Sequence, residues 1–74
     1  MRPGLALCFD RRRLVEEIRQ AMNHVIALNN REMEAVISGS FASLPPIKAE
    51  LVSARQRKDS LLESYHDHLR DHGC

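Results

Sequence analysis

Histidine and cysteine side chains near the two ends of the sequence are the residues whose chemistry could bind a metal. His68 and His72 are four residues apart near the C-terminus, and Cys74 follows them. Histidines four apart lie on one face of a helix, which is the spacing that two metal ligands need. If the chain folds back on itself, Cys8 returns to the same end. Cys8, His68, His72 and Cys74 are therefore a candidate tetrahedral zinc site.

The sequence evidence for a metal site is nevertheless weak. The sequence contains no CxxC and no HExxH pattern, and a pair of histidines four residues apart arises easily by chance. Histidines near the C-terminus of a helix are also expected because they suit its dipole. We therefore expect no resident cofactor, and zinc binding stands as the alternative.

A lysine within an apolar stripe is the second feature that could do more than pack. Placed at 100° per residue, Lys58 falls within ~20° of the centre of the apolar stripe of its helix. Asn29 falls near the centre of the other stripe, with Glu32 beside it. Asn29, Glu32 and Lys58 could form a buried polar layer that fixes register and oligomeric state. The alternative is that Lys58 packs its methylenes in the seam and extends its ammonium group to water.

No arrangement of a nucleophile with its base is evident, so we do not expect an enzyme. The basic clusters, Arg11–Arg13 and Arg55 with Arg57 and Lys58, are interleaved with carboxylates in a chain of net charge +1. A solvated face that forms ion pairs is the expected role. Binding to nucleic acid is not expected, because no helix-turn-helix spacing supports it, and a nucleic-acid accessory protein is the weaker alternative.

The elements that would position these residues are two helices. The sequence predicts a short apolar leader over residues 1–9 and a single helical hairpin domain over 10–74. Its helices cover about 10–38 and 46–72, and the loop covers about 39–45. Equal helix lengths and a short loop favour antiparallel neighbours.

Local signals mark the ends of these helices. Asp10 is suited to cap the N-terminus of the first helix, and Gly39 to follow its C-terminus. Pro46 fits the first position of the second helix, and Leu44 and Pro45 precede prolines and should stay extended. A capping box at Asn29 and Glu32 would instead break the first helix and give a three-helix arrangement.

Both predicted helices are amphipathic, with apolar residues that alternate spacings of three and four as in a coiled-coil seam. The expected interface consists of Leu14, Val15, Ile18, Met22, Val25, Met33, Val36, Leu51, Ala54, Leu61, Leu62, Tyr65 and Leu69, with Ala21 and Ile47 in the same stripes. His24 lies at the edge of its stripe and is expected to be partly buried.

These stripes are wider than a contact between two helices requires. Val15, Met33, Ile37, Val52 and Leu62 would face water in a single hairpin. Two hairpins packed face to face would cover them as a four-helix bundle, and a symmetric homodimer is the default assembly. We expect a non-enzymatic protein–protein interaction module that self-associates, or one that docks a helical partner.

Composition sets the remaining limits. A chain of 74 residues makes one small domain, whose core rarely stabilises it by more than ~3–5 kcal/mol without a further element such as oligomerisation. The apolar run of residues 5–9 is too short for a signal-peptide core or a membrane span. With two cysteines and no such segment, the sequence predicts a cytoplasmic protein with reduced thiols and no membrane contact.

Overall fold

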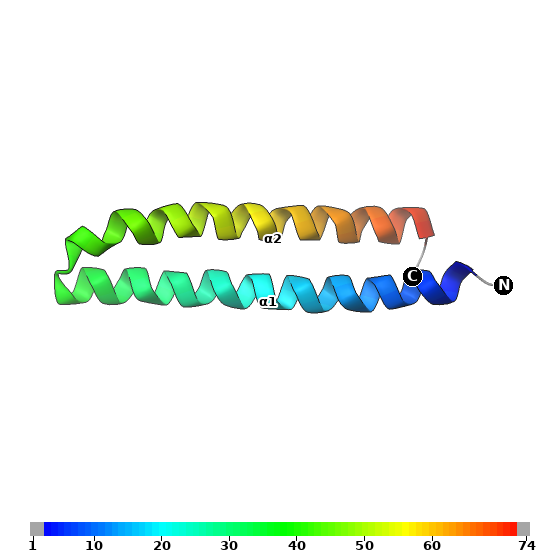
Figure 1. Ribbon diagram of the computed structural model, residues 1–74, viewed down its shortest axis with the longest axis horizontal. Helices are drawn as coiled ribbons and strands as arrows, with labels where there is room; N and C mark the ends of the chain where they lie inside the picture. Colours follow the sequence, from blue (N-terminus) through cyan, green and yellow to red (C-terminus); the bar gives the residue numbers. More distant parts are fainter. Residues whose placement is uncertain (1–2, 73–74) are drawn as a thin grey trace.

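The computed structural model describes residues 3–72, and it describes side chains for residues 11–71. Two long helices, α1 (Pro3–Ser38) and α2 (Leu44–His72), are joined by Gly39, Ser40 and the short 3-10 helix η1 (Phe41–Ser43). The chain reverses at this connection, so α1 and α2 lie side by side in antiparallel directions (Figure 1). The Cα atoms span 59 × 14 × 13 Å. The predicted all-helical hairpin is confirmed.

The helix α1 is continuous through Asn29 and Asn30, so the three-helix alternative is wrong. Asparagine in a helix interior costs at most ~0.7 kcal/mol relative to alanine. Leu28 and Ala35, on either side of the two asparagines, are buried against α2. Burying one leucine side chain contributes roughly 1.5–3 kcal/mol, which outweighs the propensity cost.

Both helices begin earlier than the sequence predicts. The start of α1 is Pro3 rather than residue 10, so Asp10 lies within the helix and not at its N-cap. Proline suits a first helical position, and no proline follows in α1 to interrupt it.

The start of α2 is Leu44 rather than Pro46, and Leu44 is helical at φ −66° and ψ −46° instead of extended. Pro45 and Pro46 therefore occupy the first turn of α2. The N–H groups of a first turn have no acceptor within the helix, so the two prolines remove no hydrogen bond there.

Gly39 ends α1 as predicted, in a left-handed conformation with φ +77°. The N–H of Ser40 donates to the carbonyl of Ala35 over 2.8 Å, and the N–H of Gly39 donates to the carbonyl of Val36 over 3.3 Å. This pair of bonds is a Schellman motif, which satisfies carbonyls that the end of a helix would leave without partners. The turn is thereby fixed by backbone bonds as well as by side-chain packing.

The contact between α1 and α2 is a heptad seam, with one residue every three or four positions on each helix. On α1 the seam residues are Leu14, Ile18, Ala21, Val25, Leu28, Glu32 and Ala35, and on α2 they are Leu44, Ile47, Leu51, Ala54, Lys58, Leu61, Tyr65 and His68. The best-buried part lies in the half of the hairpin nearer the loop, where Leu28, Ala35, Ile47, Leu51 and Ala54 form one cluster.

Candidate interaction surface

Among the side chains that the structure describes, residues 11–71, seven large apolar ones on the two helices remain exposed in the hairpin. They are Val15, Met22, Ile26, Met33, Val36 and Ile37 on α1, with Val52 on α2. Their exposed fractions range from 39% at Met22 to 78% at Ile37. Val15, Met33, Ile37 and Val52 are exposed as the sequence predicts for a single hairpin, whereas Leu62 is half-buried.

These seven side chains lie on one side of the seam. One row of seam residues on α1 contains Ile18, Val25 and Glu32. The exposed apolar residues of α1 lie ~40–140° around the helix axis from this row, all in the same direction of rotation. On α2, Val52 is rotated by ~100° in that sense from the row that contains Leu51. We refer to Val15, Met22, Ile26, Met33, Val36, Ile37 and Val52 together as the apolar face.

A hydrogen bond between the helices shows that these two flanks share one face of the hairpin. Asn29 follows the seam residue Val25 by four positions, and Arg55 follows the seam residue Leu51 by four. Arg55 Nη2 donates to Asn29 Oδ1 over 3.4 Å. The flank that carries the exposed apolar residues of α1 is therefore on the same side as the matching flank of α2.

The apolar face is hollowed near the loop. An open groove is lined by Asn29, Glu32, Met33, Val36, Ile37, Leu44 and Lys48. A neighbouring depression continues along α2 and is lined by Glu32, Lys48, Leu51, Val52 and Arg55. The walls are mainly apolar, and their charged members are Glu32, Lys48 and Arg55.

The other side of the seam is polar. Arg31 Nη1 lies 3.8 Å from Glu50 Oε2, an exposed ion pair that joins the helices. A second groove on this side is lined by His24, Ala49, Glu50, Ser53, Ala54 and Arg57. His24 is exposed, so its predicted partial burial is wrong. Its position, three residues after Ala21, directs it to the polar flank of the seam.

The residues of the expected interface divide into three groups by burial. Ile18, Leu51 and Ala54 are buried in the seam, together with Ala21 and Ile47. Leu14, Val25, Leu61, Leu62, Tyr65 and Leu69 are half-buried. Val15, Met22, Met33 and Val36 are exposed on the apolar face. The sequence missed Leu28 and Ala35 in the seam and Ile26 on the apolar face, although the three-and-four spacing from Ile18 onward leads to Leu28 and Ala35.

The three residues of the expected polar layer are half-buried, and Asn29 and Lys58 each pair with a residue outside the layer. Lys58 Nζ lies 3.2 Å from Asp59 Oδ1, its neighbour on α2. Asn29 accepts the hydrogen bond from Arg55. Glu32 lines both depressions of the apolar face beside Lys48. Lys58 and Glu32 occupy seam positions, and Asn29 stands on the flank.

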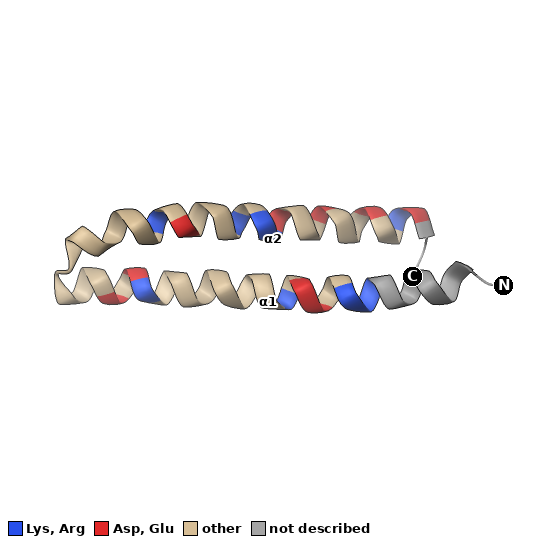
Figure 2. Cartoon of the chain, viewed as in Figure 1, with Lys and Arg blue, Asp and Glu red and all other residues tan. Residues whose placement is uncertain are grey.

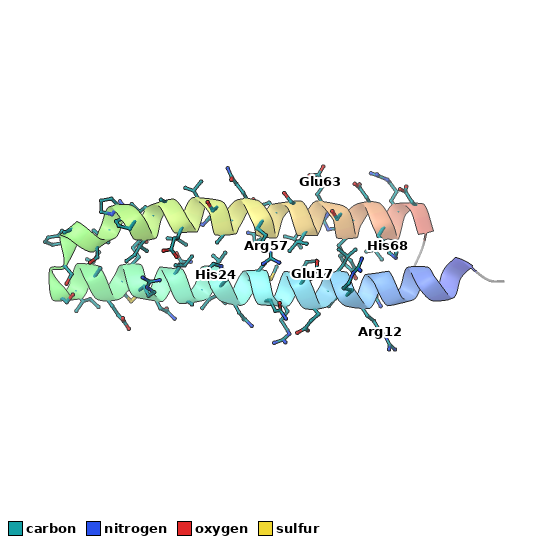
Figure 3. The ribbon with its side chains drawn as sticks, in the orientation of Figure 1. Arg12, Glu17, His24, Arg57, Glu63 and His68 are labelled. Atoms are coloured by element: carbon teal, nitrogen blue, oxygen red, sulfur yellow. The ribbon has the colours of Figure 1, made fainter. Side chains whose placement is uncertain are left out.

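Of the four candidate metal ligands, His68 is the one whose side chain is described. It is half-buried on the seam side of α2 (Figure 3). The side chains of Cys8, His72 and Cys74 lie outside the described residues. Within residues 11–71, no group of three or more His, Cys, Asp or Glu side chains could hold a metal ion.

The arginines near the start of α1 are exposed, and Arg12 points outward from the hairpin (Figure 3). Arg19, further along, forms an ion pair with Glu16 on its own helix, and its hydrogen bonds lower the pKa of Glu16.

Neither helix, over the described residues, is long and apolar enough to cross a membrane. Comparison of the chain with protein-family models, with curated proteins and with solved structures found no match.

Proposed function

We propose that this chain is a non-enzymatic interaction module whose apolar face packs against the apolar face of a second copy to form a four-helix bundle. The observation that carries the proposal is the one-sided placement of seven exposed large apolar side chains, opposite a flank of polar residues. Exposed patches of this kind on a small protein mark an interaction surface.

Energetics support association. A hairpin of two helices has one seam, and over residues 11–71 its buried apolar side chains are few: Ile18, Ala21, Leu28, Ala35, Ile47, Leu51 and Ala54. Three of these seven are alanines, which contribute little apolar area. Covering a large aliphatic side chain contributes roughly 1.5–3 kcal/mol, so a second copy would add stabilisation comparable to that of the seam itself.

The test is molar mass in solution, measured by sedimentation equilibrium at micromolar concentration. We expect the wild type to have twice the monomer mass of 8.5 kDa. Ile26→Glu should shift the mass to that of the monomer, because a charge would be buried in the contact. Ala27→Glu is the matched control, since Ala27 is the next residue but lies on the other side of the helix, and it should leave the dimer intact.

Three results would contradict the proposal. The first is a wild type that is folded and monomeric at this concentration, which would leave the apolar face for a helical partner of a different kind. The second is loss of the fold on addition of a chelator, which would favour the metal-binding alternative. The third is tight, steeply salt-dependent binding to DNA, which would favour a nucleic-acid accessory role.

A further inference from the structure

The distribution of the apolar face between the helices points to the orientation of the second copy. Six of its seven residues are on α1, from Val15 to Ile37, and Ile26 lies midway along the sequence between those two. If α1 packs antiparallel on α1 of a second copy with Ile26 at the centre, the two apolar rows overlap over their full length.

The two contacts between the helices define which part of α2 is level with Ile26. Arg31 pairs with Glu50, and Asn29 with Arg55. Because α1 and α2 run in opposite directions, moving back along α1 to Ile26 corresponds to moving forward along α2 by the same number of residues. Ile26 is therefore level with residues 55–58 of α2.

The charge of α2 changes sign at this level. Residues 44–58 carry four basic side chains and one acidic one, a net charge of +3, whereas residues 59–71 carry four acidic and one basic, a net charge of −3. Figure 2 shows mostly basic residues in the half of α2 toward the loop and mostly acidic ones toward its C-terminal end. An antiparallel pair of α2 helices centred here places opposite charges together.

We infer that the two hairpins pack with their loops at opposite ends, related by a two-fold axis perpendicular to the helices near Ile26; this inference rests on the proposed self-association. One axis then satisfies both helices. On α1, Val15 meets Ile37 of the second copy. On α2, Arg55 meets Asp59 of the second copy, and Val52 meets Leu62.

The arrangement with both loops at the same end is less favourable for two reasons. It places the apolar row of α1 against α2 of the second copy, whose matching flank carries the cations of Lys48 and Arg55. It also brings the two loop halves together. Residues 21–58 carry five basic and three acidic side chains, so two halves of net charge +2 would lie side by side.

Disulfide cross-linking of single-cysteine variants tests the orientation, in a Cys8→Ser, Cys74→Ser background that keeps the wild-type mass and helicity. A disulfide requires Cα atoms about 4.4–6.8 Å apart. We expect Ile26→Cys to cross-link to itself under mild oxidation and Ala27→Cys to remain reduced. A mixture of Val15→Cys and Ile37→Cys chains should also form a cross-linked heterodimer. With the loops at the same end, those two residues would be separated by ~33 Å along the helix.

The opposite pattern would overturn this orientation. If the protein is a dimer by mass, but Met33→Cys cross-links to Val52→Cys of another chain and Ile26→Cys does not cross-link, the loops are at the same end and self-association still holds. If the Cys8→Ser, Cys74→Ser protein is folded but has the mass of a monomer, the proposed self-association itself is wrong.

Discussion

Arg55 on α2 donates a hydrogen bond to the side-chain oxygen of Asn29 on α1, with 3.4 Å between Nη2 and Oδ1. Asn29 occupies the same flank of α1 as Val15, Met22 and Val36, which are spaced by multiples of seven residues from it. The bond thus places a polar group within a row that is otherwise apolar, at the surface where we propose a second copy binds.

Asn29→Leu should strengthen self-association by about tenfold. The new leucine completes the apolar row, and its burial contributes roughly 1.5–3 kcal/mol, part of which is offset by the lost bond to the guanidinium. Sedimentation equilibrium measures the change in Kd, with Gln20→Leu on the polar side as the control. Equal effects of the two leucines would show that Asn29 is not in the contact.

Leu28→Ala should lower the free energy of unfolding by about 2–5 kcal/mol, because it leaves a cavity in the seam. Leu28 is 1% exposed, the lowest exposure among the described hydrophobic core residues. Urea denaturation followed by circular dichroism measures the loss. Phe41→Ala is the control, since Phe41 is 63% exposed and should lose much less despite its larger side chain. Similar losses at both sites would place Leu28 outside the core.

The sequence was sufficient for the two-helix fold, the end of α1 at Gly39 and the exposure of Val15, Met33, Ile37 and Val52. It placed the centre of the α1 stripe incorrectly, however. Seam residues such as Leu28 and the exposed residues of the apolar face lie within ~180° of one another on α1, so they merge into one broad stripe when the helix is considered alone. Only contact with α2 separates them.

The helix starts could not be predicted for a different reason. The preference of a residue before proline for an extended backbone is moderate, and Leu44 gains a seam contact with the core by being helical. Asp10 is a good capping residue, but nothing in the sequence after Pro3 forces the helix to begin as late as residue 10. The preferences for capping residues and for residues before proline describe where a helix is allowed to begin. The start of α2 is determined by packing, and the start of α1 by the absence of a helix breaker after Pro3.

Lys58→Leu should raise the melting temperature and broaden the distribution of oligomers. The substitution removes a charge from a seam position and extends the apolar row of α2, while a polar seam residue restricts register and stoichiometry. Light scattering and thermal denaturation measure the two effects. Arg57→Leu removes a neighbouring cation from the exposed polar side of the seam, so it should change neither. A Lys58→Leu protein of wild-type mass and uniform size would mean that Lys58 only packs its methylenes.

Gly39→Ala should destabilise the hairpin by roughly 1–2 kcal/mol, the cost of a left-handed backbone for a residue with a Cβ. A Cβ at Gly39 would have no neighbour within 4 Å, so the cost comes from the backbone alone. Gly39→Asn should cost less, because asparagine tolerates this conformation better. Thermal unfolding of the wild type and the two variants gives the order of their stabilities. If Gly39→Asn loses as much stability as Gly39→Ala, the left-handed backbone is not the cause of the loss.

Glu16 should stabilise α1 more at neutral pH than in acid. Hydrogen bonds from Arg19, whose Nε lies 3.0 Å from Glu16 Oε2, lower the pKa of Glu16 below 4.5. When the pKa of a carboxyl is lower in the folded state, its stabilisation is complete at a pH above the pKa of the unfolded state. The stabilisation is lost as the pH falls through the pKa of the folded state. At pH values above 4.5, the melting temperature of the wild type should be slightly higher than that of Glu16→Gln. At about pH 2 the two melting temperatures should be equal. A difference that persists at pH 2 would have another origin.

The best-buried cluster lies beside the turn, between Leu28 and Ala54. Toward the other end, the described seam contains the buried Ala21 and Ile18, but its other residues, such as Leu61 and Leu69, are half-buried. Contacts near the turn also close the shortest loops, so they cost the least entropy to form. We therefore expect folding of the hairpin to begin at the turn. The same gradient predicts that the backbone amides around Leu61 and Leu69 exchange with water before those around Leu28 and Leu51.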